Sequence, residues 1–230
     1  MAKPASAIFD DSAVIDAAKD AKRGRGADAD RRAAILDCAE QVFLEDGFQA
    51  ASMSAIAAKL GGSKGTLYNY FPSKEELFLA CVSRHCEGLQ AQMESVLSES
   101  GDVREALTGM GRRYLEVVTS DDVVRKFRMV VAEAERSPEV AAAFYDVGPR
   151  SGAKMVARYI EEAMAQGVLA SSDPVRAAQA FLGLCSNWHS KARLCNVSSA
   201  PDRARIAEDV DEAVRIFLAA YGVPAAGKTT

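Results

Sequence analysis

The sequence is poor in the side chains that most catalytic and metal sites need. Its 230 residues include only two histidines, and neither belongs to a cluster of histidine, cysteine and carboxylate residues at metal-ligand spacing. We find no glycine-rich phosphate loop after a strand and no nucleophile elbow. We therefore expect no catalytic residue, no metal and no cofactor, although an enzyme is the main alternative class.

Disulfide pairs and long apolar runs are also scarce. The five cysteines are an odd number without a Cys-x-x-Cys pair, which favours reduced core thiols in a cytoplasmic protein; a redox-sensing thiol is the alternative. The uncharged run over residues 5–9 is too short for a secretion signal. The run over residues 177–190 is shorter than the roughly 20 residues that span a bilayer. We expect no membrane partner.

Strand signals are almost absent, and no internal repeat is present. Instead, apolar residues recur at helical spacing from Ile35 to Phe43, which predicts a helix from about residue 30 to residue 46, ended by Gly47. Serine caps, glycine stops and prolines at helix starts mark the others. The sequence thus predicts an all-α fold, with further helices over about residues 52–60, 63–70, 73–98, 102–119, 122–135, 138–166 (interrupted at Gly148-Pro149), 174–195 and 202–221.

Charge is distributed unevenly along the chain. The net charge is −4, yet residues 22–74 carry eight Lys or Arg against six Asp or Glu. Between Gly47 and Lys74 there is no carboxylate at all, although 26% of the chain is charged. This segment also holds two short helices joined by a glycine-containing turn, the helix-turn-helix geometry that places a helix in the DNA major groove. Because phosphates repel carboxylates, the pattern indicates DNA binding.

Residues 63–71, "SKGTLYNYF", are preceded by "AIAAKLGG" and followed by "PSKEEL". This run resembles the DNA-binding signature of the TetR family of repressors, and the resemblance covers about residues 30–78. It implies an N-terminal three-helix helix-turn-helix DNA-binding domain and a larger C-terminal helical domain for ligand binding and dimerisation. We expect a flexible arm with a basic end over residues 1–27, the DNA-binding domain over 28–74, the effector-binding and dimerisation domain over 75–224, and a disordered tail over 225–230.

The resemblance also assigns candidate DNA contacts to this chain. Tyr70 has an alternative role as a core residue, and Lys59 favours a solvated helix position over a contact. Gly62 departs from the family, which usually has an apolar residue there, and this loosens the expected turn. The candidate DNA-binding residues are Arg25, Ser52, Ser54, Lys64, Gly65, Thr66, Tyr68, Asn69, Tyr70 and Lys74, with Lys74 expected to hold a phosphate.

The C-terminal half offers aromatic and soft side chains for a pocket. The stretch "FRMVVAEAERSPEVAAAFYDVGPR" resembles a recurrent variant of the family's sensor domain and names no ligand. A small, largely apolar effector is expected, although ordinary core packing is the alternative for each residue. The candidate effector-binding residues are Met110, Tyr114, Phe127, Phe144, Phe181 and Trp188; His189, beside the tryptophan, is expected to be a satisfied helix histidine.

Apolar faces over residues 181–188 and 206–221 predict pairing of the last two helices across a two-fold axis. A homodimer matches the palindromic DNA operator that such proteins bind. The function expected from the resemblance is a repressor released from double-stranded DNA by a small-molecule effector. Activation, regulation without an effector and a structural DNA-binding role are the alternatives, and the sequence specifies neither the operator nor the genes controlled.

Overall fold

The computed structural model describes residues 11–99 and 102–223, and it confirms the all-α prediction. Over those residues, β structure is limited to one isolated bridge between Leu169 and Gly222. The helices are α1 (Asp11–Ala50), α2 (Met53–Leu60), α3 (Lys64–Tyr70), α4 (Lys74–Glu99), α5 (Val103–Thr119), α6 (Asp121–Glu133), α7 (Pro138–Tyr145), the π-helical η1 (Asp146–Arg150), α8 (Ser151–Ala165), α9 (Pro174–Leu194) and α10 (Arg203–Tyr221). The expected interruption at Gly148-Pro149 is η1.

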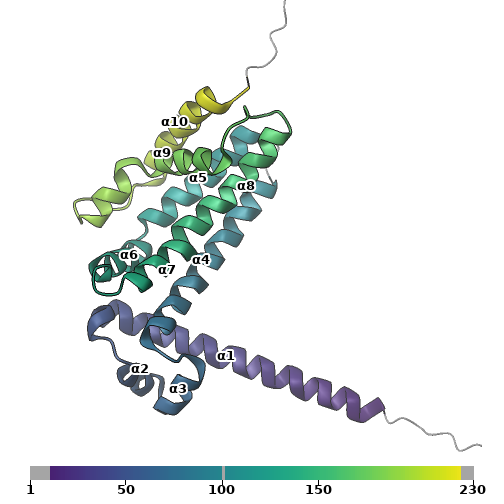
Figure 1. Cartoon of the computed structure of the whole chain (residues 1–230), viewed down its shortest axis with the longest axis vertical. Helices are drawn as coiled ribbons and strands as arrows, with labels where there is room; N and C mark the ends of the chain where they lie inside the picture. Colours follow the sequence, from purple (N-terminus) through teal and green to yellow (C-terminus); the bar gives the residue numbers. More distant parts are fainter. Residues whose placement is uncertain (1–10, 100–101, 224–230) are drawn as a thin grey trace, which may run out of the picture.

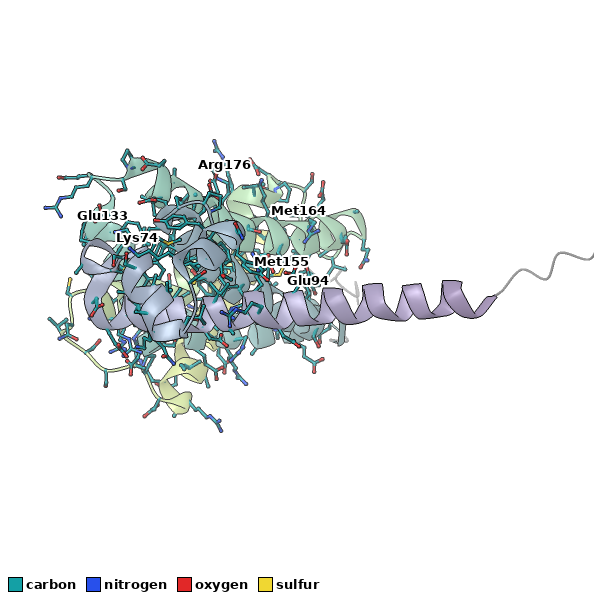
Figure 2. All side chains as sticks on the ribbon, turned by 90° about the horizontal axis from the view of Figure 1, so that it is seen from below. Lys74, Glu94, Glu133, Met155, Met164 and Arg176 are labelled. Atoms are coloured by element: carbon teal, nitrogen blue, oxygen red, sulfur yellow. The ribbon has the colours of Figure 1, made fainter. Side chains whose placement is uncertain are left out.

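Helix α4 runs the length of the molecule and connects its two parts (Figure 1). Helices α1–α3, which we call the head, lie at one end, and α5–α10, which we call the body, lie alongside the rest of α4 (Figure 1). Helices α9 and α10 form one edge of the body (Figure 1). The N-terminal part of α1 projects well beyond the head (Figures 1 and 2).

Helix α1 is longer than the sequence predicted. We expected a flexible arm up to residue 27, whereas the helix begins at Asp11. The reason is local, because residues 11–23 are rich in alanine and other residues that tolerate helix well. Gly47 does interrupt the helix as expected, with a φ of 79° that favours glycine. The side chains of residues 11–27, including Arg25, are outside the described part, as is the expected tail over 225–230.

Two hydrophobic cores hold the molecule together. The head core extends beyond the expected boundary at residue 74, because it includes Val82 of α4, Val130 of α6 and Val140 of α7. The body core contains α5, α8, α9 and α10, with Phe181 and Phe217 fully buried in edge-to-face contact. The head is therefore packed against α6 and α7 as well as joined covalently through α4.

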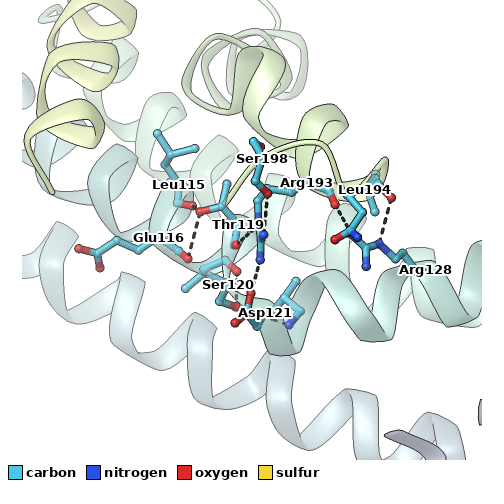
Figure 3. A network of polar contacts seen from close by, with 12 residues as sticks. Leu115, Glu116, Thr119, Ser120, Asp121, Arg128, Arg193, Leu194 and Ser198 are labelled. Atoms are coloured by element: carbon cyan, nitrogen blue, oxygen red, sulfur yellow. Dashed lines mark hydrogen bonds and ion pairs between the residues drawn. The ribbon is translucent and has the colours of Figure 1, made fainter. Parts of the chain in front are cut away.

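A buried arginine ties α9 to the junction of α5 and α6 (Figure 3). Arg193 is 7% exposed, and its guanidinium donates to the carbonyls of Thr119 and Ser198, both at 2.9 Å, and to the carboxylate of Asp121. Arg128 of α6 in turn donates to the Leu194 carbonyl at 2.9 Å.

A search of the described helices for a membrane-spanning segment finds none that has both the length and the apolar character required.

Candidate functional site

The turn between α2 and α3 is fixed by local hydrogen bonds. Ser52 and Ser63 cap the two helices, each accepting a bond of 3.1 Å from the main-chain N–H three residues on. Gly61 adopts a left-handed conformation with φ 70°, and the N–H groups of Gly61 and Gly62 bond back to carbonyls of α2. This is a Schellman ending, so the two short helices are held in a defined helix-turn-helix arrangement.

Gly62 has a packing role that the sequence did not indicate. A Cβ at this position would lie 2.7 Å from Nη2 of Arg31, on α1. Because that atom is the far end of a flexible side chain, a larger residue would move Arg31 aside and leave the turn in place. The guanidinium of Arg32 lies 5.2 Å from the centre of the Phe71 ring. Two α1 arginines therefore stand beside α3, although neither belongs to the predicted set of contacts.

Helix α3 has one buried and one exposed face. Leu67 and Phe71 are 0% and 4% exposed and attach the helix to the head core. On the opposite face, Tyr68 is 47% exposed. The predicted DNA contacts that lie exposed are Ser52, Ser54, Lys64, Gly65, Tyr68 and Asn69. Of these, the Ser52 oxygen serves as the α2 cap; among the others, the Thr66 hydroxyl is paired with Ser63 at 2.9 Å.

Lys74 has a different position from the one expected. Its ammonium donates to the carbonyls of Phe48 at 2.7 Å, Ala51 at 3.2 Å and Gln49 at 3.4 Å. It also lies 4.4 Å from the centre of the Phe48 ring. Seen from below, Lys74 lies within the head, near the end of α1 (Figure 2). The phosphate contact predicted for Lys74 therefore has intramolecular competitors, the carbonyls at and just after the end of α1.

The hydroxyl of Tyr70 is also occupied within the chain. It donates to Oδ1 of Asp28 at 2.6 Å, and this hydrogen bond raises the pKa of Tyr70. The predicted contact of this hydroxyl with DNA therefore has an intramolecular competitor. Lys59 forms an ion pair with Glu45 at 2.7 Å, so it is a solvated helix residue as expected.

A cavity of about 360 Å³ lies between α4, η1 and helices α5 to α9. Tyr114, Phe127 and Phe144 line it as the sequence predicted, and the two phenylalanine rings are stacked 5.6 Å apart. The walls are almost entirely apolar. The described residues that line it are Val82, Cys86, Met93, Tyr114, Val117, Val118, Val123, Lys126, Phe127, Phe144, Gly148, Pro149, Gly152, Ala153, Leu182, Ser186, Ser190 and Leu194.

Three predicted pocket residues lie elsewhere. Met110 and Phe181 are both 0% exposed and belong to the body core. Trp188 is 67% exposed, with the ammonium of Lys191 4.8 Å from its ring centre. The assignment of Met110, Phe181 and Trp188 to the cavity is therefore wrong, because α5 and α9 carry apolar residues on more than one face.

Few polar groups line the described part of the cavity, and of these only Tyr114 was predicted from the sequence. The Tyr114 hydroxyl is hydrogen-bonded to Ser186, and burial raises its pKa. Burial also raises the pKa of the Cys86 thiol. Lys126 is 6% exposed, and its ammonium pairs with Asp122 at 2.7 Å and with Glu40 of α1. In the sequence, Lys126 and Asp122 resemble an ordinary surface ion pair, so nothing marked this lysine as buried.

Known protein families account for both parts of this architecture. Residues 35–81 match the family described as bacterial regulatory proteins, tetR family. Residues 105–223 match the family described as AefR-like transcriptional repressor, C-terminal domain. The chain belongs to the TetR family. This confirms the resemblance found in the sequence, and it makes the protein a DNA-binding transcriptional regulator and not an enzyme.

Individual relatives of this TetR-family regulator agree with that assignment. The solved structure of the flavonoid-responsive regulator FrrA is 35% identical, with a TM-score of 0.76, covering 86% of this chain and 100% of FrrA. A TetR-family regulator from Mesorhizobium loti MAFF303099 is 28% identical, with a TM-score of 0.77, covering 85% of this chain and 98% of its own. The transcriptional activator FasR of Mycolicibacterium smegmatis is 32% identical over 114 residues, so the match spans about half of FasR (51%) and 49% of this chain.

Membership of the TetR family implies binding to a DNA operator and dimerisation. Most residues predicted to pair between subunits, such as Val210, Val214 and Phe217, are instead buried within one subunit. A groove of about 530 Å³ lies between α9 and α10, and Leu184 and Ile216 belong to its lining.

The ring of His189 is hydrogen-bonded to the carboxylate of Asp209 at 2.6 Å, which confirms a satisfied helix histidine.

Proposed function

We propose that this TetR-family regulator is a dimeric repressor that a small, planar aromatic effector releases from a palindromic operator. The observation that carries the proposal is the apolar cavity of 360 Å³, whose wall includes Val82, Cys86 and Met93 of the same helix α4 that begins in the head at Lys74. Occupation of the cavity can thus displace a helix that is continuous with the DNA-binding unit.

Recognition of DNA is assigned to the exposed face of α3. Lys64, Tyr68 and Asn69 are exposed there and are proposed to reach bases or phosphates in the major groove. Arg31 and Arg32, beside α3, are proposed as additional phosphate contacts. In the operator complex the two α3 helices would lie about 34–36 Å apart, one turn of DNA.

Dimerisation is proposed to use the outer surface of α9 and α10. Leu184 and Ile216 line its groove, and Val175 and Trp188 are 42% and 67% exposed on the same helix α9. Large apolar side chains that are exposed along one helix pair favour an interface. Light scattering should give twice the chain mass of 24.5 kDa at micromolar concentration, and a single chain mass would contradict the proposal.

The effector class follows from the size and chemistry of the cavity. Its volume falls within the range of about 300–1,000 Å³ that is usual for small-molecule sites. The stacked rings of Phe127 and Phe144 favour a planar aromatic guest. The similar regulator FrrA is described as flavonoid-responsive, which supports testing flavones first.

The deciding experiment is an operator titration with and without a flavone. Effector and operator must weaken each other's binding by the same factor, typically about 5- to 150-fold. Flavone binding that leaves operator affinity unchanged would refute the release mechanism. Trp188 is exposed outside the cavity, so calorimetry suits the binding measurement better than tryptophan fluorescence.

Activation is the second candidate, because the similar protein FasR is described as a transcriptional activator. Transcription in vitro from an operator-containing promoter distinguishes the two. A repressor lowers transcript yield when the effector is absent, whereas an activator raises it.

A further inference from the structure

Helix α6 contacts the effector cavity on one side and α1 of the head on the other. Val123, Lys126 and Phe127 of α6 belong to the cavity wall. Towards α1, Lys126 pairs with Glu40, and Glu133 accepts a hydrogen bond from Gln49. Lys126 therefore belongs to the cavity and to the contact with the DNA-binding head at the same time.

Among the described residues that line the cavity, Lys126 has the only charged side chain. Its side chain is 8% exposed, so its ammonium depends on protein partners for its three hydrogen-bond donors. Its described partners are the carboxylates of Asp122 and Glu40. A guest in the cavity with an anionic oxygen would be a third acceptor and a competitor of Glu40.

Glu40 is not left alone when Lys126 changes partner. Its second oxygen accepts from Nη2 of Arg84 at 3.1 Å, and Nη1 of Arg84 pairs with Asp37 at 2.7 Å. Removal of one partner from a buried pair is usually costly because the other charge stays unpaired. Here Arg84 continues to neutralise Glu40, so the exchange avoids most of that cost.

The remainder of the cavity accepts an uncharged aromatic body. Phe127 and Phe144 stack at 5.6 Å, and the hydrogen-bonded pair of Tyr114 and Ser186 supplies neutral polar contacts. An aromatic molecule with one ionised hydroxyl satisfies both the apolar walls and the single cation.

We propose that the effector is a planar aromatic compound with an acidic hydroxyl, and that its oxygen binds Lys126 in exchange for Glu40. The exchange breaks the ion pair between Lys126 of α6 and Glu40 of α1, and so weakens one of the contacts that hold the head to the body. This inference rests on the proposed function, since it names the effector class and the residue that passes its binding to the DNA-binding unit.

The test compares a hydroxyflavone with its methyl ether by titration calorimetry on the full-length protein, at a pH where the hydroxyl is ionised. Wild-type protein should prefer the hydroxyflavone by about 10- to 100-fold, the effect of one hydrogen bond to a charged group. Lys126→Met should lose this preference and still bind the ether. Arg125→Met, an exposed neighbour on α6, is the matched control and should keep the preference.

Glu40→Gln tests the exchange itself. The substitution removes the charge that competes for Lys126. The variant should therefore bind the hydroxyflavone at least about fivefold more tightly than wild type and bind operator DNA more weakly. Asp46→Asn, an exposed acid of α1, is its control and should behave as wild type. An operator titration of each variant completes the comparison.

A preference retained by Lys126→Met would overturn the assignment of Lys126. Binding of neither flavone by wild type would overturn the ligand class, and unchanged hydroxyflavone affinity in Glu40→Gln would overturn the exchange. These three outcomes are flavone affinities, which calorimetry measures without DNA. The proposed function fails separately, if wild-type protein binds no operator DNA or if bound flavone leaves operator affinity unchanged.

Discussion

Lys74→Met is expected to destabilise the protein without removing a DNA contact. The substitution keeps the length of the side chain and removes an ammonium that donates to the Phe48, Gln49 and Ala51 carbonyls. It also removes a cation 4.4 Å from the Phe48 ring. The end of α1 then has three carbonyls without their charged donor.

The magnitude follows from three overlapping contributions of one ammonium. A hydrogen bond from a charged donor contributes about 1.5–3 kcal/mol. A cation at a helix C-terminus contributes about 0.3–1 kcal/mol, and a cation over an aromatic ring about 0.5–2 kcal/mol, depending on how far the pair is desolvated. Because the same group makes all three and is half-buried, the values do not add. We expect a loss of about 2 kcal/mol in the free energy of unfolding.

Urea unfolding followed by circular dichroism measures this loss, at one protein concentration because the stability of a dimer depends on it. Lys64→Met is the matched control, since Lys64 is exposed, and such surface changes usually stay within about 0.5 kcal/mol. Suppose that Lys74→Met unfolds like wild type and instead reduces the salt dependence of operator binding. Lys74 would then be a phosphate contact, and the assignment of its ammonium to the end of α1 would be refuted.

Three further outcomes are expected. Lys64→Met should reduce the log–log salt slope of operator binding by about 0.9 per subunit, measured by titration at several salt concentrations, and an unchanged slope would contradict a phosphate contact. Gly111→Ala should lower stability by about 1–3 kcal/mol in urea unfolding despite alanine's higher helix propensity. The reason is that an added Cβ would lie 2.8 Å from a Val210 methyl group; a stabilised variant would show that the core yields there. Burial raises the pKa of Cys81 and Cys185 to about 12, so both hold little reactive thiolate at neutral pH, and mass spectrometry should show exposed Cys195 alkylated well before either.

The parts of the structure that depend on short-range rules could be predicted from the sequence. Ser52, Ser63 and Gly61 act on the residues next to them, so the ends of α2 and α3 were predictable. The same holds for the interruption at Gly148-Pro149. Lys74 shows the opposite case, because its partners at residues 48–51 are more than 20 residues away and only the folded head brings them to it.

The effector cavity could be predicted only in part. Tyr114, Phe127 and Phe144 line it, but Phe181 has the same character and lies in the core on the opposite side of its helix. Periodicity identifies an apolar face and does not say whether a cavity or another helix covers it. Lys126 had no signal at all, because its burial depends on Glu40, 86 positions earlier in the chain.

The buried Arg193 gives α6 a fixed pivot. Its bonds to Thr119 and Asp121 hold the end of α5 and the start of α6 against α9. Arg128 adds a second tie to α9 at the Leu194 carbonyl, so a tilt of α6 displaces its C-terminal end most. The helix rises about 18 Å from Asp121 to Glu133, so a tilt of about 10° at the pivot displaces the end next to Gln49 by about 3 Å. Lys126 lies about 7.5 Å along the helix from Asp121, so the same tilt moves it by only about 1.3 Å, and leverage alone makes the movement at the head about 2.4 times larger.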